Sequence, residues 1–141
     1  MSSRVTNVAI LGSTGSIGCS TLDVIAALPD RLATYAITAH SRIGQAVQQA
    51  HQHRPRWLVA TDPRQAEPVS QWQLPPETQV LVGEEAVEQI ARDPEVAIVV
   101  AAIVGSAGLR GTWAAIEAGK RVALANKETM VVAGPLVMGL A

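Results

Sequence analysis

The hydrophobic residues of this chain follow two alternating patterns, which predict strands and helices in turn. Apolar runs bounded by turn residues predict strands at 5–11, 34–39, 57–61, 79–82, 96–104 and 121–125. Helical spacing predicts helices from about 17 to near 29 and over 43–53, 84–92 and 109–118, with a stop at Gly119 and a final helix beginning at Asn126. Four prolines between 62 and 78 predict mostly irregular structure there, with room for one short helix.

This alternation predicts an α/β fold, a doubly wound, Rossmann-like and mostly parallel sheet with helices on both faces. The most apolar strand, 96–104, is expected in the middle of the sheet, where helices cover both of its faces. The 141 residues have the length of one domain, and we expect residues 1–141 to form it.

A glycine-rich segment follows the first predicted strand and carries the strongest functional signal. It reads Gly12-Ser13-Thr14-Gly15-Ser16-Ile17-Gly18. A strand, a glycine turn and a helix in this order direct backbone N–H groups and the positive end of the helix toward a diphosphate. The G-x-x-G-x-x-G spacing is one residue wider than the usual dinucleotide fingerprint, so a turn that only packs strand against helix is the alternative. A Walker loop fits worse, because the first lysine of the chain is Lys120.

The charge pattern after the second predicted strand favours NADP(H) over NAD(H). A domain that binds NAD usually has an acidic residue here, which binds the ribose hydroxyls. No acidic residue lies between Asp30 and Asp62, and Ser41 and Arg42 stand where the strand should end. The guanidinium of Arg42 can bind a 2′-phosphate through two hydrogen bonds. The alternative is a solvated surface charge. His40 adjoins this site and is either a contact to adenine or phosphate or an ordinary residue at a strand end.

A second polar group follows the predicted strand at 121–125. Asn126, Lys127 and Glu128 stand at the carboxyl end of this strand, the edge at which ligands of open α/β sheets bind. Their amide, ammonium and carboxylate can orient a nicotinamide ribose and a sugar substrate. The alternative is a helix start, with Asn126 as N-cap and Glu128 beside the helix dipole. Lys127 favours the functional interpretation, since the chain has only two lysines.

Two other groups of residues are weaker candidates for chemistry. Cys19 lies in the first turn after the glycines, where a helix dipole can acidify a thiol, but a small packing residue is the simpler interpretation. His51 and His53 lie two residues apart on a predicted helix and so face different ways, which argues against a metal pair.

Composition excludes several broad classes of partner. A formal net charge of −1 gives no general reason to expect nucleic acid or an anionic membrane surface. The longest apolar run, 96–104, is too short for a bilayer, which needs about 20 residues. The single cysteine excludes an internal disulfide and fits a reducing compartment. A cytoplasmic location is therefore the default expectation, and a plastid location after loss of a transit peptide stays open.

Three segments in this order together resemble the 1-deoxy-D-xylulose 5-phosphate reductoisomerase family. The glycine segment at 12–18 alone admits other NADP-dependent reductases, but the family likeness also covers two further segments. These are Ala101-Ala102-Ile103-Val104-Gly105 and Leu124-Ala125-Asn126-Lys127-Glu128. The likeness runs over nearly the whole chain and corresponds to the family's N-terminal NADPH-binding domain.

The resemblance implies a reaction of non-mevalonate isoprenoid synthesis in two parts. A divalent metal, Mg²⁺ or Mn²⁺, holds the oxygens of 1-deoxy-D-xylulose 5-phosphate while its skeleton rearranges. NADPH then reduces the resulting aldehyde to 2-C-methyl-D-erythritol 4-phosphate. The full-length enzyme is expected to be a homodimer.

The resemblance also assigns roles to individual residues. Thr14, Gly15, Ser16 and Ile17 would bind the cofactor phosphates. Asn126 and Glu128 would hold the cofactor further along, and Lys127 would contact the substrate.

The chain departs from the family pattern at two places. His40 and Arg42 stand where the family usually has a glycine and an asparagine, so the contacts to the adenosine phosphate depend on the charge of Arg42. The family's acidic metal-binding motif and catalytic lid lie beyond residue 141. We therefore expect neither metal ligands nor catalytic residues in this sequence, and no turnover by it alone.

The end of the sequence supports the same expectation. Residues 130–141 are almost wholly apolar, and an exposed apolar helix needs a cover, so we expect the start of a longer protein with catalytic and C-terminal domains outside this chain. Two alternatives stay open: another NADP-dependent reductase of a small phosphate or aldehyde, and a non-catalytic module that binds NADP(H).

Overall fold

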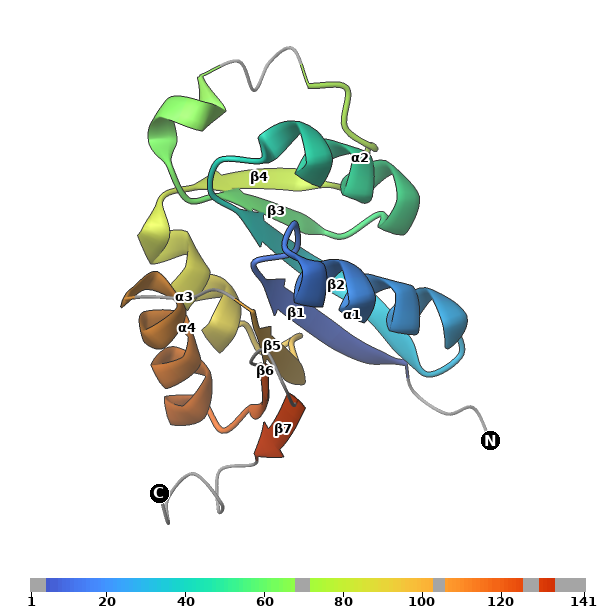
Figure 1. The fold of residues 1–141 in the computed structure, drawn as a ribbon, viewed down its shortest axis with the longest axis vertical. Helices are drawn as coiled ribbons and strands as arrows, with labels where there is room; N and C mark the ends of the chain where they lie inside the picture. The colour runs from blue at the N-terminus through green and yellow to red at the C-terminus, as the bar shows by residue number, and fades with distance from the viewer. Residues whose placement is uncertain (1–4, 68–71, 103–105, 126–129, 134–141) are drawn as a thin grey trace.

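The computed structural model describes residues 5–67, 72–102, 106–125 and 130–133, which form one seven-stranded sheet flanked by helices (Figure 1). The strands are β1 (Thr6–Leu11), β2 (Leu32–Ala39), β3 (Trp57–Ala60), β4 (Gln79–Val82), β5 (Ile98–Ala101), β6 (Arg121–Ala125) and β7 (Met130–Ala133). The helices are α1 (Ser16–Ala27), α2 (Ile43–His53), the 3₁₀ turn η1 (Pro63–Ala66), α3 (Glu84–Arg92) and α4 (Ser106–Glu117). None of the helices in this part of the chain is long and apolar enough to cross a membrane.

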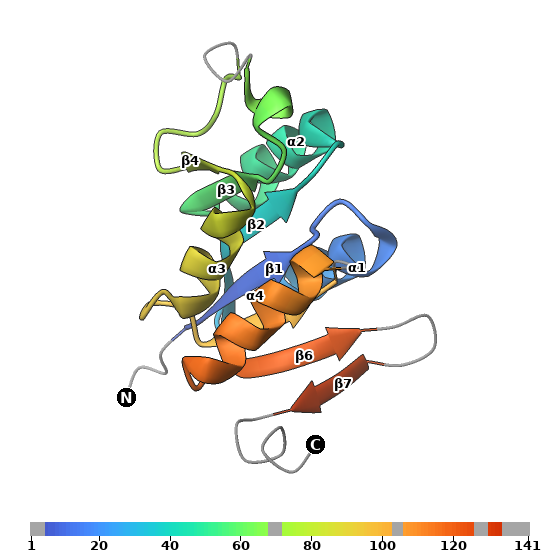
Figure 2. The same ribbon diagram turned by 90° about the vertical axis from the view of Figure 1, so that its left-hand side faces the viewer.

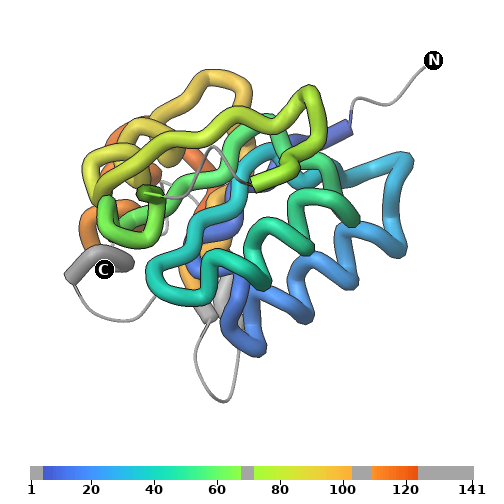
Figure 3. The backbone as a smooth tube through the Cα atoms, turned by 90° about the horizontal axis from the view of Figure 1, so that it is seen from above, coloured from blue at the N-terminus to red at the C-terminus, as the bar shows by residue number. Residues whose placement is uncertain are grey.

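The sheet separates two hydrophobic cores, one on each face. Because side chains alternate along a strand, Val8 and Ile10 of β1 pack on one face while Ala9 and Leu11 pack on the other. The first core includes residues of α1 and α2, and the second includes residues of α3 and α4. Figure 3 shows α1 and α2 side by side on their face of the sheet. The prediction of a sheet with helices on both faces is confirmed.

The strand order is β4-β3-β2-β1-β5-β6-β7, and the first six strands in sequence run parallel. The chain builds outward from β1 to β4 and then crosses back to place β5 on the other side of β1. Order therefore reverses between β1 and β5, which pair from Val8–Ile98 to Leu11–Ala101. In doubly wound sheets, ligands bind outside the carboxyl ends of the strands at such a reversal. This edge is where the candidate site must be sought.

Most predicted elements are confirmed, with shifts of a few residues at their ends. α2, β4, α3 and β6 have the predicted bounds. α4 begins three residues earlier than predicted, and Gly119 ends it with a φ of 77°. The strand predicted over 96–104 is confirmed as a central strand between β1 and β6, but β5 itself is shorter, and residues 103–105 lie outside the described part. η1 is the one short helix expected between 62 and 78.

The final helix predicted from Asn126 is wrong over Met130–Ala133. These residues form β7, which runs antiparallel to β6 and pairs Ala125 with Met130 (Figure 2). Helical periodicity cannot be read from so short an apolar run. Val131 and Val132 are β-branched and favour strand, and the free edge of β6 offers backbone hydrogen bonds. Residues 126–129 lie outside the described part of the chain.

Candidate functional site

The strands that precede the predicted site segments have their carboxyl ends at one edge of the sheet. Residues 41–42 follow β2, residues 14–17 follow β1, and residues 126–128 follow β6, with β5 lying between β1 and β6. Neighbouring strands lie about 4.8 Å apart, so β2 and β6 are separated by about 14 Å at this edge. The order of the segments matches the order of an adenosine phosphate, a diphosphate and a nicotinamide along one extended dinucleotide.

The three glycines of the loop after β1 meet three different structural requirements. Gly12 has a φ of 88°, a left-handed conformation that turns the chain away from β1. A Cβ on Gly18 would lie 2.6 Å from Ser13 Cα, so only glycine lets α1 pack this close to the loop. A Cβ on Gly15 would meet nothing within 4 Å. Gly15 therefore faces open space, where a bound group can approach the backbone.

The N-terminus of α1 is free to bind an anion. Gly15 is its N-cap and has no side chain to cap the first turn, and no described residue supplies a cap in its place. The first turn, which begins with Ser16 and Ile17, contains no acidic residue that would neutralise the positive end of the helix. Its unpaired N–H groups and dipole together favour a phosphate oxygen.

Strand β2 makes hydrogen bonds to the beginning of the glycine loop. Thr38 is fully buried, and its hydroxyl oxygen accepts a hydrogen bond from the Gly12 N–H at 2.9 Å. Its carbonyl oxygen accepts another from the Ser13 N–H, also at 2.9 Å. The side chain of Ser13 is fully buried as well, and its hydroxyl donates to Gln49 Oε1 at 2.7 Å. These contacts fix the loop before any ligand binds.

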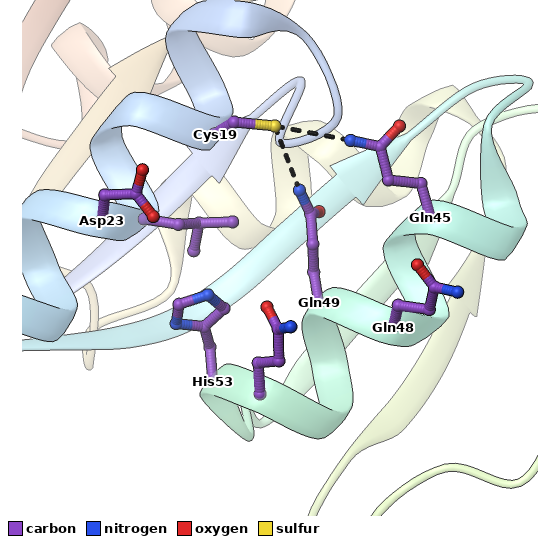
Figure 4. A pocket seen from close by; sticks show the side chains of 8 residues that line it. Cys19, Asp23, Gln45, Gln48, Gln49 and His53 are labelled. Atoms are coloured by element: carbon purple, nitrogen blue, oxygen red, sulfur yellow. Dashed lines mark hydrogen bonds between the residues drawn. The ribbon is translucent and has the colours of Figure 1, made fainter.

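Two glutamines of helix α2 donate hydrogen bonds to the same loop. Gln49 Nε2 donates to the Ser13 carbonyl oxygen at 2.9 Å, and Gln45 Nε2 donates to the Thr14 carbonyl oxygen at 3.2 Å. Both amides also donate to Cys19 Sγ, at 3.4 Å from Gln45 and 3.5 Å from Gln49 (Figure 4). Cys19 is partly buried. This agrees with the simpler interpretation from the sequence, in which Cys19 is a small packing residue.

Thr38, Gln45 and Gln49 support this loop, although none of the three was predicted as a functional residue from the sequence. A signal for the glutamines was present, because Gln45 and Gln49 lie four residues apart and share one side of α2. Gln49 also interrupts the buried face formed by Ile43, Ala46 and Ala50. A buried amide on an apolar face needs hydrogen-bond partners, and in this fold the glycine loop provides them.

Ser41 and Arg42 lie between β2 and α2, at the position predicted for them, and Arg42 is the N-cap of α2. Both residues are exposed. None of the ion pairs between described residues involves Arg42. The acidic residue after β3, Asp62, pairs with Arg64 instead, at 3.1 Å between carboxylate oxygen and guanidinium nitrogen. Hydrogen bonds from the Arg64 side chain and backbone hold the pKa of Asp62 below its ordinary value. The charge of Arg42 is therefore available for an anion.

His40 lines a hollow of about 450 Å³ at the same edge of the sheet. The hollow lies beyond the ends of β2, β3 and β4, and Thr61, Asp62 and Glu84 also line it. The Nδ1 atom of His40 lies 2.8 Å from the Thr61 hydroxyl oxygen. This hydrogen bond holds the imidazole near the end of β3, and His40 is exposed, as Ser41 and Arg42 are.

The remaining predicted site residues, Asn126, Lys127 and Glu128, lie outside the described residues. Their place in the fold is bounded by the end of β6 at Ala125 and the start of β7 at Met130. Within the described ranges, no group of three or more histidine, cysteine or carboxylate side chains could hold a metal ion.

The chain is similar to one family of enzymes over almost its whole length. The family model for 1-deoxy-D-xylulose 5-phosphate reductoisomerase matches residues 8–134. A protein of that name from Methylobacillus flagellatus is 52% identical over 132 residues, which cover 94% of this chain and 34% of the relative. One from Stutzerimonas stutzeri is 49% identical, covering 96% of this chain and 35% of the relative. The chain thus spans about a third of the length of the relatives it matches.

Solved structures of the same name are similar in fold as well as in sequence. The protein from Zymomonas mobilis in complex with NADPH has a TM-score of 0.81 and 36% identity, over 89% of this chain and 33% of that one. A reductoisomerase in complex with NADPH, fosmidomycin and magnesium has a TM-score of 0.77 and 42% identity, over 88% of this chain and 31% of that one.

Proposed function

Because the chain belongs to the 1-deoxy-D-xylulose 5-phosphate reductoisomerase family, we propose that it is the NADPH-binding part of such an enzyme. The full-length protein would convert 1-deoxy-D-xylulose 5-phosphate to 2-C-methyl-D-erythritol 4-phosphate in isoprenoid synthesis. Residues 1–141 would form the cofactor domain. The metal-binding, catalytic and C-terminal domains would lie outside this sequence.

The observation that carries the proposal is the geometry of the loop at 12–18. An open approach at Gly15, an uncapped first turn of α1 and close packing at Gly18 occur together at the reversal point of the sheet. A loop that only joined a strand to a helix would need neither the open approach nor the free N–H groups. The two cofactor complexes among the similar structures support NADPH as the ligand.

The proposal gives each end of the cofactor its own contacts. Backbone N–H groups of Thr14, Gly15, Ser16 and Ile17 would bind the diphosphate. Ser41 and Arg42 would bind the 2′-phosphate of the adenosine half. Asn126 and Glu128 would hold the nicotinamide half, near the end of β6. When bound, NADPH supplies the hydride for the reduction, and these residues hold it in place for that step.

The substrate and the metal would be held mainly by other parts of the protein. Lys127 would contribute an ammonium group to the bound sugar phosphate. The family's acidic metal-binding motif follows the part of the enzyme that this chain resembles, so the ligands of Mg²⁺ or Mn²⁺ would lie elsewhere in the full-length protein. The reductoisomerase structure in complex with NADPH, fosmidomycin and magnesium supports a divalent ion for this enzyme. We further propose that the full-length enzyme is a homodimer in the cytoplasm and that it binds neither nucleic acid nor a membrane.

The experiment that tests this function is NADPH consumption by the full-length protein. We expect oxidation of NADPH only when 1-deoxy-D-xylulose 5-phosphate and a divalent ion are both present, and none after chelation of the ion. If NADPH binds but no combination of ketose phosphate and metal leads to its oxidation, the non-catalytic module becomes the better account.

A lysine substitution tests the proposed contact with the substrate. Lys127→Ala should raise the KM for the ketose phosphate at least about tenfold, because a charged hydrogen bond is lost, while the Kd for NADPH changes much less. Lys120→Ala is the matched control, since Lys120 donates to the carbonyl oxygen of Asp93 before β6 begins, at the opposite end of that strand. Equal loss of substrate use and cofactor binding in Lys127→Ala would contradict the assigned role.

A further inference from the structure

Two glutamines of α2 make hydrogen bonds that bear on how the glycine loop presents its donors. The amide of Gln49 is buried and fully used: its Oε1 accepts from the Ser13 hydroxyl at 2.7 Å, and its Nε2 donates to the Ser13 carbonyl oxygen at 2.9 Å. A carbonyl oxygen can only accept, so the nitrogen of the amide must face it. Gln45 makes the corresponding contact one residue along, to the Thr14 carbonyl oxygen.

Because the peptide unit is planar, these contacts also determine the direction of the N–H group of the following residue. In a trans peptide, the C=O of one residue and the N–H of the next point in opposite directions. The described peptides are all trans. Because α2 binds the carbonyl oxygens of Ser13 and Thr14, the N–H groups of Thr14 and Gly15 are directed away from α2. A Cβ built on Gly15 would also meet nothing within 4 Å, so the backbone at Gly15 is not covered by other parts of the described chain.

We propose that Gln45 and Gln49 are positioning residues, which set the direction of the Thr14 and Gly15 N–H groups for the cofactor diphosphate. This inference rests on the proposed function and deepens it. On this proposal α2 contributes to cofactor binding in two ways. Arg42 at its start binds the adenosine phosphate, and the glutamines one and two turns later orient the loop that binds the diphosphate. Donors held in place before binding lose less entropy when the ligand arrives.

A role limited to filling space in the core would not account for the polarity of the contact. The other buried residues on this side of α2 are Ile43, Ala46 and Ala50, and an apolar residue at 49 would extend that face. A buried amide instead costs free energy unless each polar atom is paired. Here the pairing is with the loop, and the Ser13 side chain that completes it is also fully buried.

The test compares methionine variants of the glutamines in the full-length protein. Gln45→Met and Gln49→Met keep the length of the side chain but remove the donors to the loop. Gln48→Met and Gln52→Met are matched controls, because these two exposed glutamines line a hollow between α1 and α2 together with Gln45 and Gln49. Figure 4 shows Gln45, Gln48 and Gln49 around this hollow. Two dissociation constants are measured for each protein, for NADPH and for adenosine 2′-monophosphate, which carries the 2′-phosphate but no diphosphate.

We expect the Kd for NADPH to rise about tenfold in Gln45→Met and in Gln49→Met, which corresponds to about 1.4 kcal/mol. The Kd for adenosine 2′-monophosphate should change by less than about threefold, because the site at Arg42 does not use these donors. The control variants should bind both ligands as the wild type does.

Two results would overturn the inference. Unchanged NADPH binding in both variants would show that the loop does not need the glutamines, and equal weakening of both ligands would show that they only hold α2 in place. If Gln49→Met fails to fold, Gln45→Met decides alone, since its side chain is only partly buried. Failure of the proposed function is seen separately, as a wild-type protein that does not bind NADPH.

Discussion

Two glycines of the glycine loop have different roles, one in cofactor binding and one in folding. Gly15 has ordinary backbone angles, with φ −75° and ψ 172°, so an alanine fits there without strain. Gly18 has no room for a Cβ, since the backbone of Ser13 lies within 2.7 Å of its ideal position. The two glycines therefore have different reasons to be glycine, and alanine substitution distinguishes them.

Gly15→Ala should destabilise the protein by no more than about 1 kcal/mol, the difference between glycine and alanine at an N-cap, because its methyl group meets nothing in the protein. It should weaken NADPH binding at least about tenfold, because the methyl group takes the space that the diphosphate needs. Gly18→Ala should destabilise the protein by about 1–3 kcal/mol, because helix or loop must move. Denaturant unfolding and NADPH titration measure the two effects. Wild-type affinity in Gly15→Ala would mean that the diphosphate does not approach the loop there.

Arg42 tests the choice between the two nicotinamide cofactors. Arg42→Glu should weaken NADPH binding more than about tenfold, because a charged hydrogen bond is replaced by repulsion, while NADH binding is spared. Arg31→Glu makes the same change of charge just before the opposite end of β2, and it should not distinguish the two cofactors. The Kd values of both cofactors are measured for both variants. An equal effect of Arg42→Glu on NADPH and NADH would remove the case for a 2′-phosphate contact.

At the level of elements, the hydrophobic pattern predicts long helices and buried strands well. α2 and α3 each bury one face, and their predicted bounds are the observed ones. The pattern gave a wrong prediction at Met130–Ala133, because four apolar residues do not distinguish a helix from a strand. These residues form a strand by pairing with the edge of β6. It also did not show which polar side chains of α2 and β2 hold the loop, because those partners lie 25–36 residues away in sequence.

The end of α4 offers a test of how local geometry stops a helix. Gly119 adopts a φ of 77°, the Gly119 N–H donates to the Ile116 carbonyl oxygen, and the Lys120 N–H donates to that of Ala115. Gly119→Ala should destabilise the protein by about 1 kcal/mol through backbone strain alone, since its Cβ meets no other atom. Gly44→Ala, inside α2 and equally open, should be neutral or stabilising by about 0.5 kcal/mol. Denaturant unfolding that ranked the two variants the other way round would contradict this account.

At the level of the whole molecule, the fold places the ends of three distant strands at one edge. The carboxyl ends of β2, β1 and β6 lie at this edge because the strands are parallel, and β6 lies on the other side of β1 from β2 because strand order reverses between β1 and β5. The prediction of a doubly wound sheet from the sequence was enough to expect this edge. The directions of the N–H groups within it could not be predicted, because they depend on contacts between α2 and the loop.

Binding across this edge should stabilise the protein as a whole. At a concentration of NADPH one hundred times its Kd, the free energy of unfolding should rise by about 2.7 kcal/mol, since the unfolded chain does not bind the cofactor. NADH at the same concentration should give a smaller rise, because it lacks the 2′-phosphate. Thermal unfolding of the full-length protein with each cofactor measures the difference. Equal stabilisation by the two would argue against NADP(H) as the natural ligand.

The most direct test of the central claim is a crystal structure of the full-length protein with NADPH bound. The account predicts diphosphate oxygens within about 3.2 Å of backbone nitrogen atoms between Thr14 and Ile17, at the start of α1. A diphosphate bound elsewhere, with the N–H groups of this turn left to solvent, would contradict it.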